Sequence, residues 1–221
     1  LTQVRILPLA PYEVVMNYRV MELWNPGVLL GQLPQDLFQQ LKTNCLSNFA
    51  TEKYNHQLVA NIKEEYQYPH QQHPELSNFL IETYNVWRQT FRCAHNLLEN
   101  EYPDVNDVWV NMQRKGEYNP NHNHGGHVSF VIWVKIPYEI DEELKVDHYT
   151  KKNDTLRKAA FEFTYSTMNH GVSLHTMWIN KYDEGTIIMF PANMLHCVYP
   201  FTTSDDVRIS VAGNMIIKRR S

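Results

Sequence analysis

The sequence predicts a fold of the α+β class, mainly β, in which helices near the N-terminus support a β-sandwich or jelly-roll barrel. Two observations predict it. From residue 105 onward, short β-branched and aromatic segments follow one another closely, and most are bounded by Gly, Pro, Asn or Asp. Before that point, apolar residues recur with a helical period. A helical region followed by a run of strands is typical of such a helix-supported architecture.

Two segments before residue 105 have the pattern of helices. Segment 34–49 opens with Pro34, a residue favoured in the first helical turn, and its apolar residues follow at near-helical spacing. Segment 75–100 contains the clearest helix, whose broad apolar face we expect in the core; it comprises Phe79, Leu80, Tyr84, Trp87, Phe91, Ala94, Leu97 and Leu98. Segment 12–24, rich in Val, Tyr and Met, predicts one or two strands.

The strands that we expect in the second half of the chain are 105–113, 127–136, 161–165, 173–179, 185–190, 194–201 and 207–217. Segment 139–158 interrupts them with charges of both signs, which predicts a solvated insertion; a lid or binding arm at the barrel mouth is the alternative. The expected organisation is one domain over 1–221, with mixed strands and helices in 1–104 and the jelly-roll core in 105–217.

Composition excludes several classes of protein. A chain of 221 residues with 43% hydrophobic and 12% aromatic residues is that of a globular domain, not a disordered segment. The net charge of -4 gives no basic footprint, so nucleic-acid binding is not expected. No apolar run is long enough for a membrane span. The three widely spaced cysteines fit neither a disulfide framework nor a cysteine metal site, which favours a reducing, cytoplasmic location.

The stretch "NPNHNHGGHVSFVIW" (119–133) is the first candidate for chemistry. His122 and His124 are two residues apart, so in extended chain their side chains point to one face and can bind one metal ion. His127 follows a Gly-Gly pair, which can bend the chain and bring that imidazole to the same ion instead. A histidine-rich loop without metal is the alternative.

His196 and the strand that follows it are the second candidate. Arg208 comes twelve residues after His196, and Ser210 alternates onto the same face of the last strand. An Arg fork beside a hydroxyl is suited to binding a carboxylate, and an Arg in an otherwise apolar strand needs an anionic partner. Other histidines are expected to be structural or solvated, namely His70, His73, His95, His170 and His175.

The order of these motifs resembles the Fe(II)- and 2-oxoglutarate-dependent dioxygenases, and within them a prolyl-hydroxylase-like branch with phage-type and uncharacterised bacterial members. "SFVIWVKIP" (129–137) is similar to the strand that follows the histidine pair in that branch. "GTIIMFPANMLHCVYPF" (185–201) and "RISVAGN" (208–214) are similar to its later strands. The resemblance covers roughly residues 105–217, and it implies a double-stranded β-helix, or jelly-roll, core.

The resemblance also implies roles for individual residues. His122 and His196 match the first and last Fe(II) ligands of the facial triad. His124 stands where the common pattern has Asp or Glu, which leaves His124 or, as the alternative, His127 as the second ligand. Residues matching those that bind the distal carboxylate of 2-oxoglutarate are Arg208 and Ser210, and polar residues that match positions touching the cosubstrate are Asn111 and Gln113.

The activity that this resemblance implies is hydroxylation of an unactivated C–H bond with O2, releasing succinate and CO2, with ascorbate as an optional supporting reductant. The implied substrate is a prolyl or other side chain of a peptide or protein; a small molecule is the alternative. For a phage-encoded chain the location would be the host cytoplasm. Two rival hypotheses remain: a three-histidine cupin-like metalloenzyme that does not use 2-oxoglutarate, and a non-enzymatic β-sandwich binding module.

Overall fold

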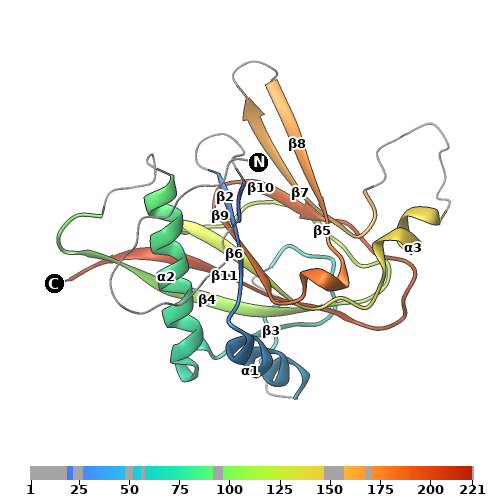
Figure 1. The fold of residues 1–221 in the computed structure, drawn as a ribbon, viewed down its shortest axis with the longest axis horizontal. Coiled ribbons are helices and arrows are strands. Elements are labelled where there is room, and N and C mark those ends of the chain that lie inside the picture. Colours follow the sequence, from blue (N-terminus) through green and yellow to red (C-terminus); the bar gives the residue numbers. More distant parts are fainter. Residues whose placement is uncertain are drawn as a thin grey trace.

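A computed structural model describes residues 19–21, 27–47, 52–55, 58–91, 97–146, 157–167 and 171–220. Its strands form two antiparallel sheets (Figure 1). The larger sheet has the order β1-β2-β9-β6-β11-β4-β3, with strands Arg19–Met21, Val28–Gln32, Thr186–Pro191, Val128–Lys135, Arg208–Arg219, Glu101–Gln113 and Glu65–Gln67. The smaller sheet has the order β5-β10-β7-β8, with strands Asn119–His122, Leu195–Val198, Ala160–Thr167 and Gly171–Trp178.

Two helices cover the outer face of the larger sheet, as expected for an apolar stripe that must be buried. They are α1 (Gln35–Leu46) and α2 (Pro74–Thr90), and Figure 1 shows α2 running across the strands. Alternation along β11 divides the residues of the strand between two environments. Ile209 and Val211 pack in the core below the helices, whereas Arg208 and Ser210 line a cavity between the sheets.

This architecture confirms the predicted mainly β, jelly-roll fold with helices supplied by the first half of the chain. All seven strands expected after residue 105 are present, with shifted ends. Three strands were not predicted: β2 and β3, which are short and lie in the helical half, and β5, which contains His122. Among the described residues, no helix has the length and apolar composition that crossing a bilayer requires.

The helix expected in 75–100 is shorter than predicted, and segments 12–24 and 139–158 lie only partly within the described residues. The helix in segment 75–100 ends at Thr90, so Leu97 packs against the core from beyond the helix and Leu98 is 56% exposed. Of segment 12–24, only Arg19–Met21 is described, as a strand, and residues 92–96 and 168–170, which include His95 and His170, are outside the described ranges. The insertion 139–158 begins with a short helix, α3 (Ile140–Lys145), and residues 147–156 are not described.

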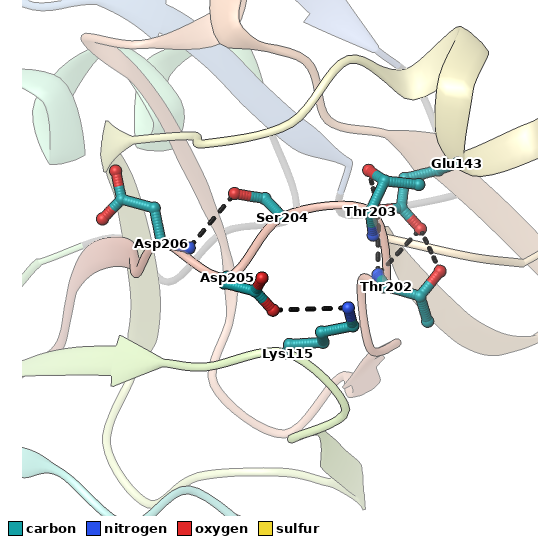
Figure 2. A network of polar contacts seen from close by, with 7 residues as sticks. All are labelled: Lys115, Glu143, Thr202, Thr203, Ser204, Asp205 and Asp206. Atoms are coloured by element: carbon teal, nitrogen blue, oxygen red, sulfur yellow. Dashed lines mark hydrogen bonds and ion pairs between the residues drawn. The ribbon is translucent and has the colours of Figure 1, made fainter.

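Helix α3 is tied to the loop between β10 and β11 through one buried carboxylate, that of Glu143, which is 0% exposed. It accepts hydrogen bonds from the backbone N–H of Thr202 at 2.8 and 2.9 Å and from that of Thr203 at 2.6 Å, and both hydroxyls also donate to it (Figure 2). Charged groups nearby on the same loop form exposed pairs, Asp205 with Lys115 and Asp206 with Lys135. The insertion therefore fixes the loop that leads to Arg208.

Glu143→Gln is expected to destabilise the protein by about 2 kcal/mol. The amide nitrogen of Gln would replace a carboxylate oxygen that now accepts from backbone N–H groups, and these donors would then face another donor. The measurement is the free energy of unfolding from urea denaturation. The matched control is Glu142→Gln on the same helix, where an exposed ion pair with Lys145 is removed and a change of less than about 0.5 kcal/mol is expected. Equal effects of the two substitutions would contradict a structural role of Glu143.

The same carboxylate should give stability a pH dependence. Burial alone would raise the pKa of Glu143, but the hydrogen bonds from Thr203 and Thr202 outweigh burial and hold it below its ordinary value. A carboxyl with a lowered folded pKa stabilises the fold above its unfolded pKa, about 4.3, and loses that contribution as pH falls through the folded value. The stability difference between wild type and Glu143→Gln should therefore be constant above about pH 5.5 and shrink at lower pH.

Candidate active site

Three histidines meet between the two sheets. Strands β5 and β10 pair antiparallel with His122 directly opposite His196, and His124 follows two residues after His122. The ring centroids of His122 and His196 are 4.2 Å apart. The ring centroid of His124 lies 4.8 Å from that of His122 and 5.1 Å from that of His196. One ligand atom of each residue lies within 4.8 Å of the others. The cluster therefore brings together two histidine motifs that are distant in the sequence, since His196 comes 72 residues after His124.

Backbone carbonyl groups determine which ring nitrogen of two of these histidines carries the proton. Nδ1 of His122 is 2.7 Å from the carbonyl oxygen of Pro120, and Nδ1 of His196 is 2.9 Å from that of Met194. A carbonyl oxygen only accepts, so each Nδ1 carries a hydrogen and each Nε2 keeps its lone pair. Metal-binding histidines are commonly oriented in this way.

The cluster is held in its neutral form. Burial, the largest cause, lowers the pKa of His122, lowers that of His124 to about 4, and places that of His196 well below its ordinary value. A protonated imidazole would also repel a second protonated imidazole beside it. The charge of His122 lowers the pKa of His124 further, and the charges of His122 and His124 lower that of His196. Neutral imidazole is the form that coordinates metal, so the burial favours a metal site.

His127, the alternative second ligand, points elsewhere. Its Nδ1 lies 3.3 Å from the hydroxyl oxygen of Tyr84, and its ring meets Trp87 edge to face, so it contacts helix α2 on the opposite side of the larger sheet. Gly126 has a φ of 104°, which turns the chain between the two histidines. The geometry thus brings His124, not His127, to the cluster.

The neighbouring strands place Arg208 and its companions in the same cavity. Arg208 lies opposite Gln113 and Ser210 opposite Asn111 in the β11–β4 pairing. The Arg208 side chain is 4% exposed; it donates to the Tyr138 hydroxyl at 2.9 Å and to the Gln113 side-chain oxygen. No carboxylate pairs with it among the described residues. Such a buried, unpaired guanidinium needs an anion.

One cavity connects the cluster with the arginine. Its wall contains seven of the eight candidate site residues, all except His127, and they are His122, His124, His196, Arg208, Ser210, Asn111 and Gln113. Two features of this region were missed. Trp109 lines the cavity and meets the ring of His124 at 5.4 Å, and Tyr138 binds Arg208. Trp109 could have been found from the sequence, because it lies two residues before Asn111 and four before Gln113, and alternate residues of a strand share one face.

Residues 107–214, which contain the histidine cluster, Arg208 and Ser210, match the family described as "Putative 2OG-Fe(II) oxygenase". Residues 107–214 belong to this family. The 2OG-Fe(II) oxygenase assignment implies iron and 2-oxoglutarate, as the order of the motifs predicted.

Solved structures are similar to this chain in fold. A Pseudomonas putida prolyl-4-hydroxylase is 12% identical, with a TM-score of 0.50 over 93% of this chain and 94% of that one. A viral collagen prolyl hydroxylase of Paramecium bursaria Chlorella virus-1 is 13% identical, with a TM-score of 0.46 over 81% and 91%. A Trichoplax adhaerens prolyl hydroxylase is 11% identical, with a TM-score of 0.49 over 90% and 81%. A search of curated protein sequences found no match.

The residues of this site fit a divalent metal ion. Three neutral imidazoles offer one ligand atom each, and imidazole is a preferred ligand of iron as well as of zinc and copper. They also fit a dicarboxylate, because Arg208 is buried and has no acidic partner among the described residues. His124 is the departure from the common pattern, which has Asp or Glu at that position.

Proposed function

We propose that the chain is an Fe(II)- and 2-oxoglutarate-dependent dioxygenase that hydroxylates an unactivated C–H bond and releases succinate and CO2. The observation that carries the proposal is a cavity shared by a neutral three-histidine cluster and a buried arginine, for which the described part of the chain offers no acidic partner. The proposed substrate is a side chain of a peptide or protein, with prolyl as the first candidate. Support for prolyl comes from the fold likeness to a prolyl-4-hydroxylase. The proposed catalytic unit is a single domain over 1–221.

The proposed roles follow from position. His122, His124 and His196 hold the metal, and the bound metal and 2-oxoglutarate supply the oxidising power for attack on the C–H bond. Arg208 binds one carboxylate of the cosubstrate, and Tyr138 orients the guanidinium by accepting from it at 2.9 Å. Ser210 and Asn111, whose side chains are 3.3 Å apart, provide polar groups beside Arg208. Apolar residues of the wall, including Phe161 and Phe190, keep water from the histidines.

The experiment that tests this proposal is anaerobic titration of the apo-protein with Fe(II) and then with 2-oxoglutarate. We expect a weak visible charge-transfer band that requires both additions and weakens in Arg208→Ala. Metal binding without a band would favour the three-histidine metalloenzyme that does not use 2-oxoglutarate. Absence of metal binding would favour the non-enzymatic β-sandwich module.

Ser210→Ala should weaken 2-oxoglutarate binding about 5- to 10-fold, the usual effect of losing one hydrogen bond of about 1 kcal/mol. The measurement is the dissociation constant of 2-oxoglutarate by calorimetry in the presence of Mn(II), which replaces iron without oxidation. Metal affinity should be unchanged, because Ser210 does not belong to the histidine cluster. An unchanged cosubstrate affinity would remove Ser210 from the proposed binding site.

A further inference from the structure

Strand β8 is a long edge of the smaller sheet, and Figure 1 shows its hairpin with β7 projecting from the rest of the molecule. Among the edge strands of the two sheets, β1 and β3 have three residues each and β5 has four, whereas β8 has eight. Natural sheets limit pairing with other chains by short edge strands, or by charges, prolines and bulges on longer ones. The sequence of β8, GVSLHTMW, contains no proline, lysine, arginine or acidic residue, and its pairing with β7 has no bulge. This edge therefore lacks the usual protections against pairing.

Large apolar side chains are exposed along one face of β8. Phe163 of β7 is buried in the core and lies opposite His175, so the odd-numbered residues of β8 point toward the core. The even-numbered residues point to the other face, and three of them are exposed there: Val172 by 70%, Leu174 by 45% and Trp178 by 49%. Every second residue of an edge strand also turns its N–H and C=O groups outward. A further strand would pair with this row of main-chain groups and cover the apolar side chains beside it.

The sequence of β8 is complementary to a second copy of itself. When two copies pair antiparallel about a two-fold axis at His175, Val172 lies opposite Trp178 of the second copy, and Leu174 lies opposite Thr176 of the second copy. Both pairs occur twice and lie on the face that is now exposed. Aromatic and β-branched residues that lie directly opposite each other form favourable cross-strand pairs. On the inner face the two His175 rings are opposite each other; burial lowers the pKa of His175, so both rings are neutral at pH 7 and do not repel each other.

We propose that the chain forms a two-fold symmetric dimer in which the β8 strands of two copies pair antiparallel. Each copy contributes the order β5-β10-β7-β8, so the two four-stranded sheets become one continuous sheet with the two β8 strands at its centre. A second copy is the occupant because a two-fold interface needs one self-complementary surface, and the register at His175 supplies it. The histidine cluster stays outside the interface, since β7 separates β8 from β10, the strand of His196. This dimer does not depend on the proposed activity.

The first measurement is sedimentation equilibrium of the wild-type protein at concentrations from about 1 to 100 µM. The average mass should rise with concentration from that of one chain toward that of two. Two strands and a few apolar side chains make an interface at the lower end of the usual size range, so we expect a dissociation constant on the order of 10 µM.

Leu174→Lys determines whether β8 is the surface that pairs. The substitution places a charge on the edge strand of each copy, and each dimer contains it twice, so the dissociation constant should rise more than about 30-fold. Leu46→Lys is the matched control, because it is the same substitution at a leucine that is 54% exposed at the end of α1. Its dissociation constant should stay within about 2-fold of wild type. Val172→Lys repeats the test at a position of β8 that is 70% exposed.

His175→Cys tests the register. Residues directly opposite each other in an antiparallel pair have Cβ atoms about 4.5–5.5 Å apart, close to the separation in a disulfide. Oxidised glutathione should therefore convert this variant to a covalent dimer well above the level of wild type, whose native cysteines provide the baseline. Ser173→Cys is the control, because in this register it lies opposite Met177 of the second copy. It should give no more covalent dimer than wild type.

The outcomes that overturn the proposal are distinct. A wild-type protein that stays monomeric at about 100 µM overturns it, and this is the result expected if β8 receives a strand of another protein. Equal dissociation constants of wild type and folded Leu174→Lys mean that the dimer uses another surface. Equal covalent yields of His175→Cys and Ser173→Cys exclude the two-fold register at His175, and with it the proposed pairing. Circular dichroism establishes whether Leu174→Lys is folded, and Val172→Lys replaces it if it is not.

Discussion

His196→Ala should abolish metal binding, with a loss of affinity above about 100-fold, because even residues that only orient a metal ligand contribute about 10- to 100-fold. His196 is 3% exposed, lies directly opposite His122, and has its Nδ1 hydrogen directed to the Met194 carbonyl oxygen. Its Nε2 is therefore the atom available to a metal. The measurement is Mn(II) affinity by calorimetry, together with the metal content of protein purified after loading with Fe(II).

The matched control for this substitution is His175→Ala. His175 lies in the same small sheet, opposite Phe163, which in turn lies opposite His196, and it is not part of the histidine cluster. Metal affinity should stay within about 2-fold of wild type in this variant, since no ligand is lost. Tight Mn(II) binding by His196→Ala, or equal losses in both variants, would contradict the proposed ligand set.

Arg208→Met should abolish cosubstrate binding while changing the free energy of unfolding of the apo-protein by no more than about 2 kcal/mol. Losing one member of a buried charged pair costs about 3 kcal/mol or more, so the affinity for 2-oxoglutarate should fall more than about 100-fold. In the apo-protein the guanidinium is a buried charge that no acidic group of the described ranges pairs with, and replacing it by an apolar side chain of similar length removes that desolvation cost. Unsatisfied groups left at Gln113 and Tyr138 act in the opposite direction.

Two measurements on this variant separate function from stability. Calorimetry with Mn(II) and N-oxalylglycine, a 2-oxoglutarate analogue that is not decarboxylated, gives the affinity, and urea denaturation without ligands gives a free energy of unfolding expected within about 2 kcal/mol of wild type. Lys135→Met is the control, because it removes a partly exposed cation of the same sheet that is paired with Asp206. Retained affinity in Arg208→Met would mean that the arginine has another role.

That the candidate site residues lie together could be predicted, because their spacing matches the period of a strand. His122 and His124, and likewise Arg208 and Ser210, are separated by two residues, and in extended chain such pairs share a face. The strand pairing then places Arg208 beside Gln113. The prediction that these motifs would lie together also depended on their order along the chain, which resembles the oxygenase family.

Contacts between distant segments could not be predicted in this way. Glu143 in α3 reads as one more charge in a polar insertion, and only the fold shows that Thr202 and Thr203 surround it. Tyr138 follows a strand without any periodic relation to Arg208, 70 residues later. The choice between His124 and His127 likewise depended on the backbone turn at Gly126, since either histidine was within reach in sequence.

The hydrogen bonds of the three histidines suggest how the ligand set can change over evolutionary time. His122 and His196 are each anchored by a carbonyl oxygen two residues earlier in the chain, an arrangement that a carboxylate, lacking a donor, could not keep. The ring of His124 has no such anchor among the described contacts; its neighbours are the rings of Trp109, His122 and His196. Of the three positions, 124 is therefore the one at which an acid and a histidine can replace each other without breaking a backbone anchor.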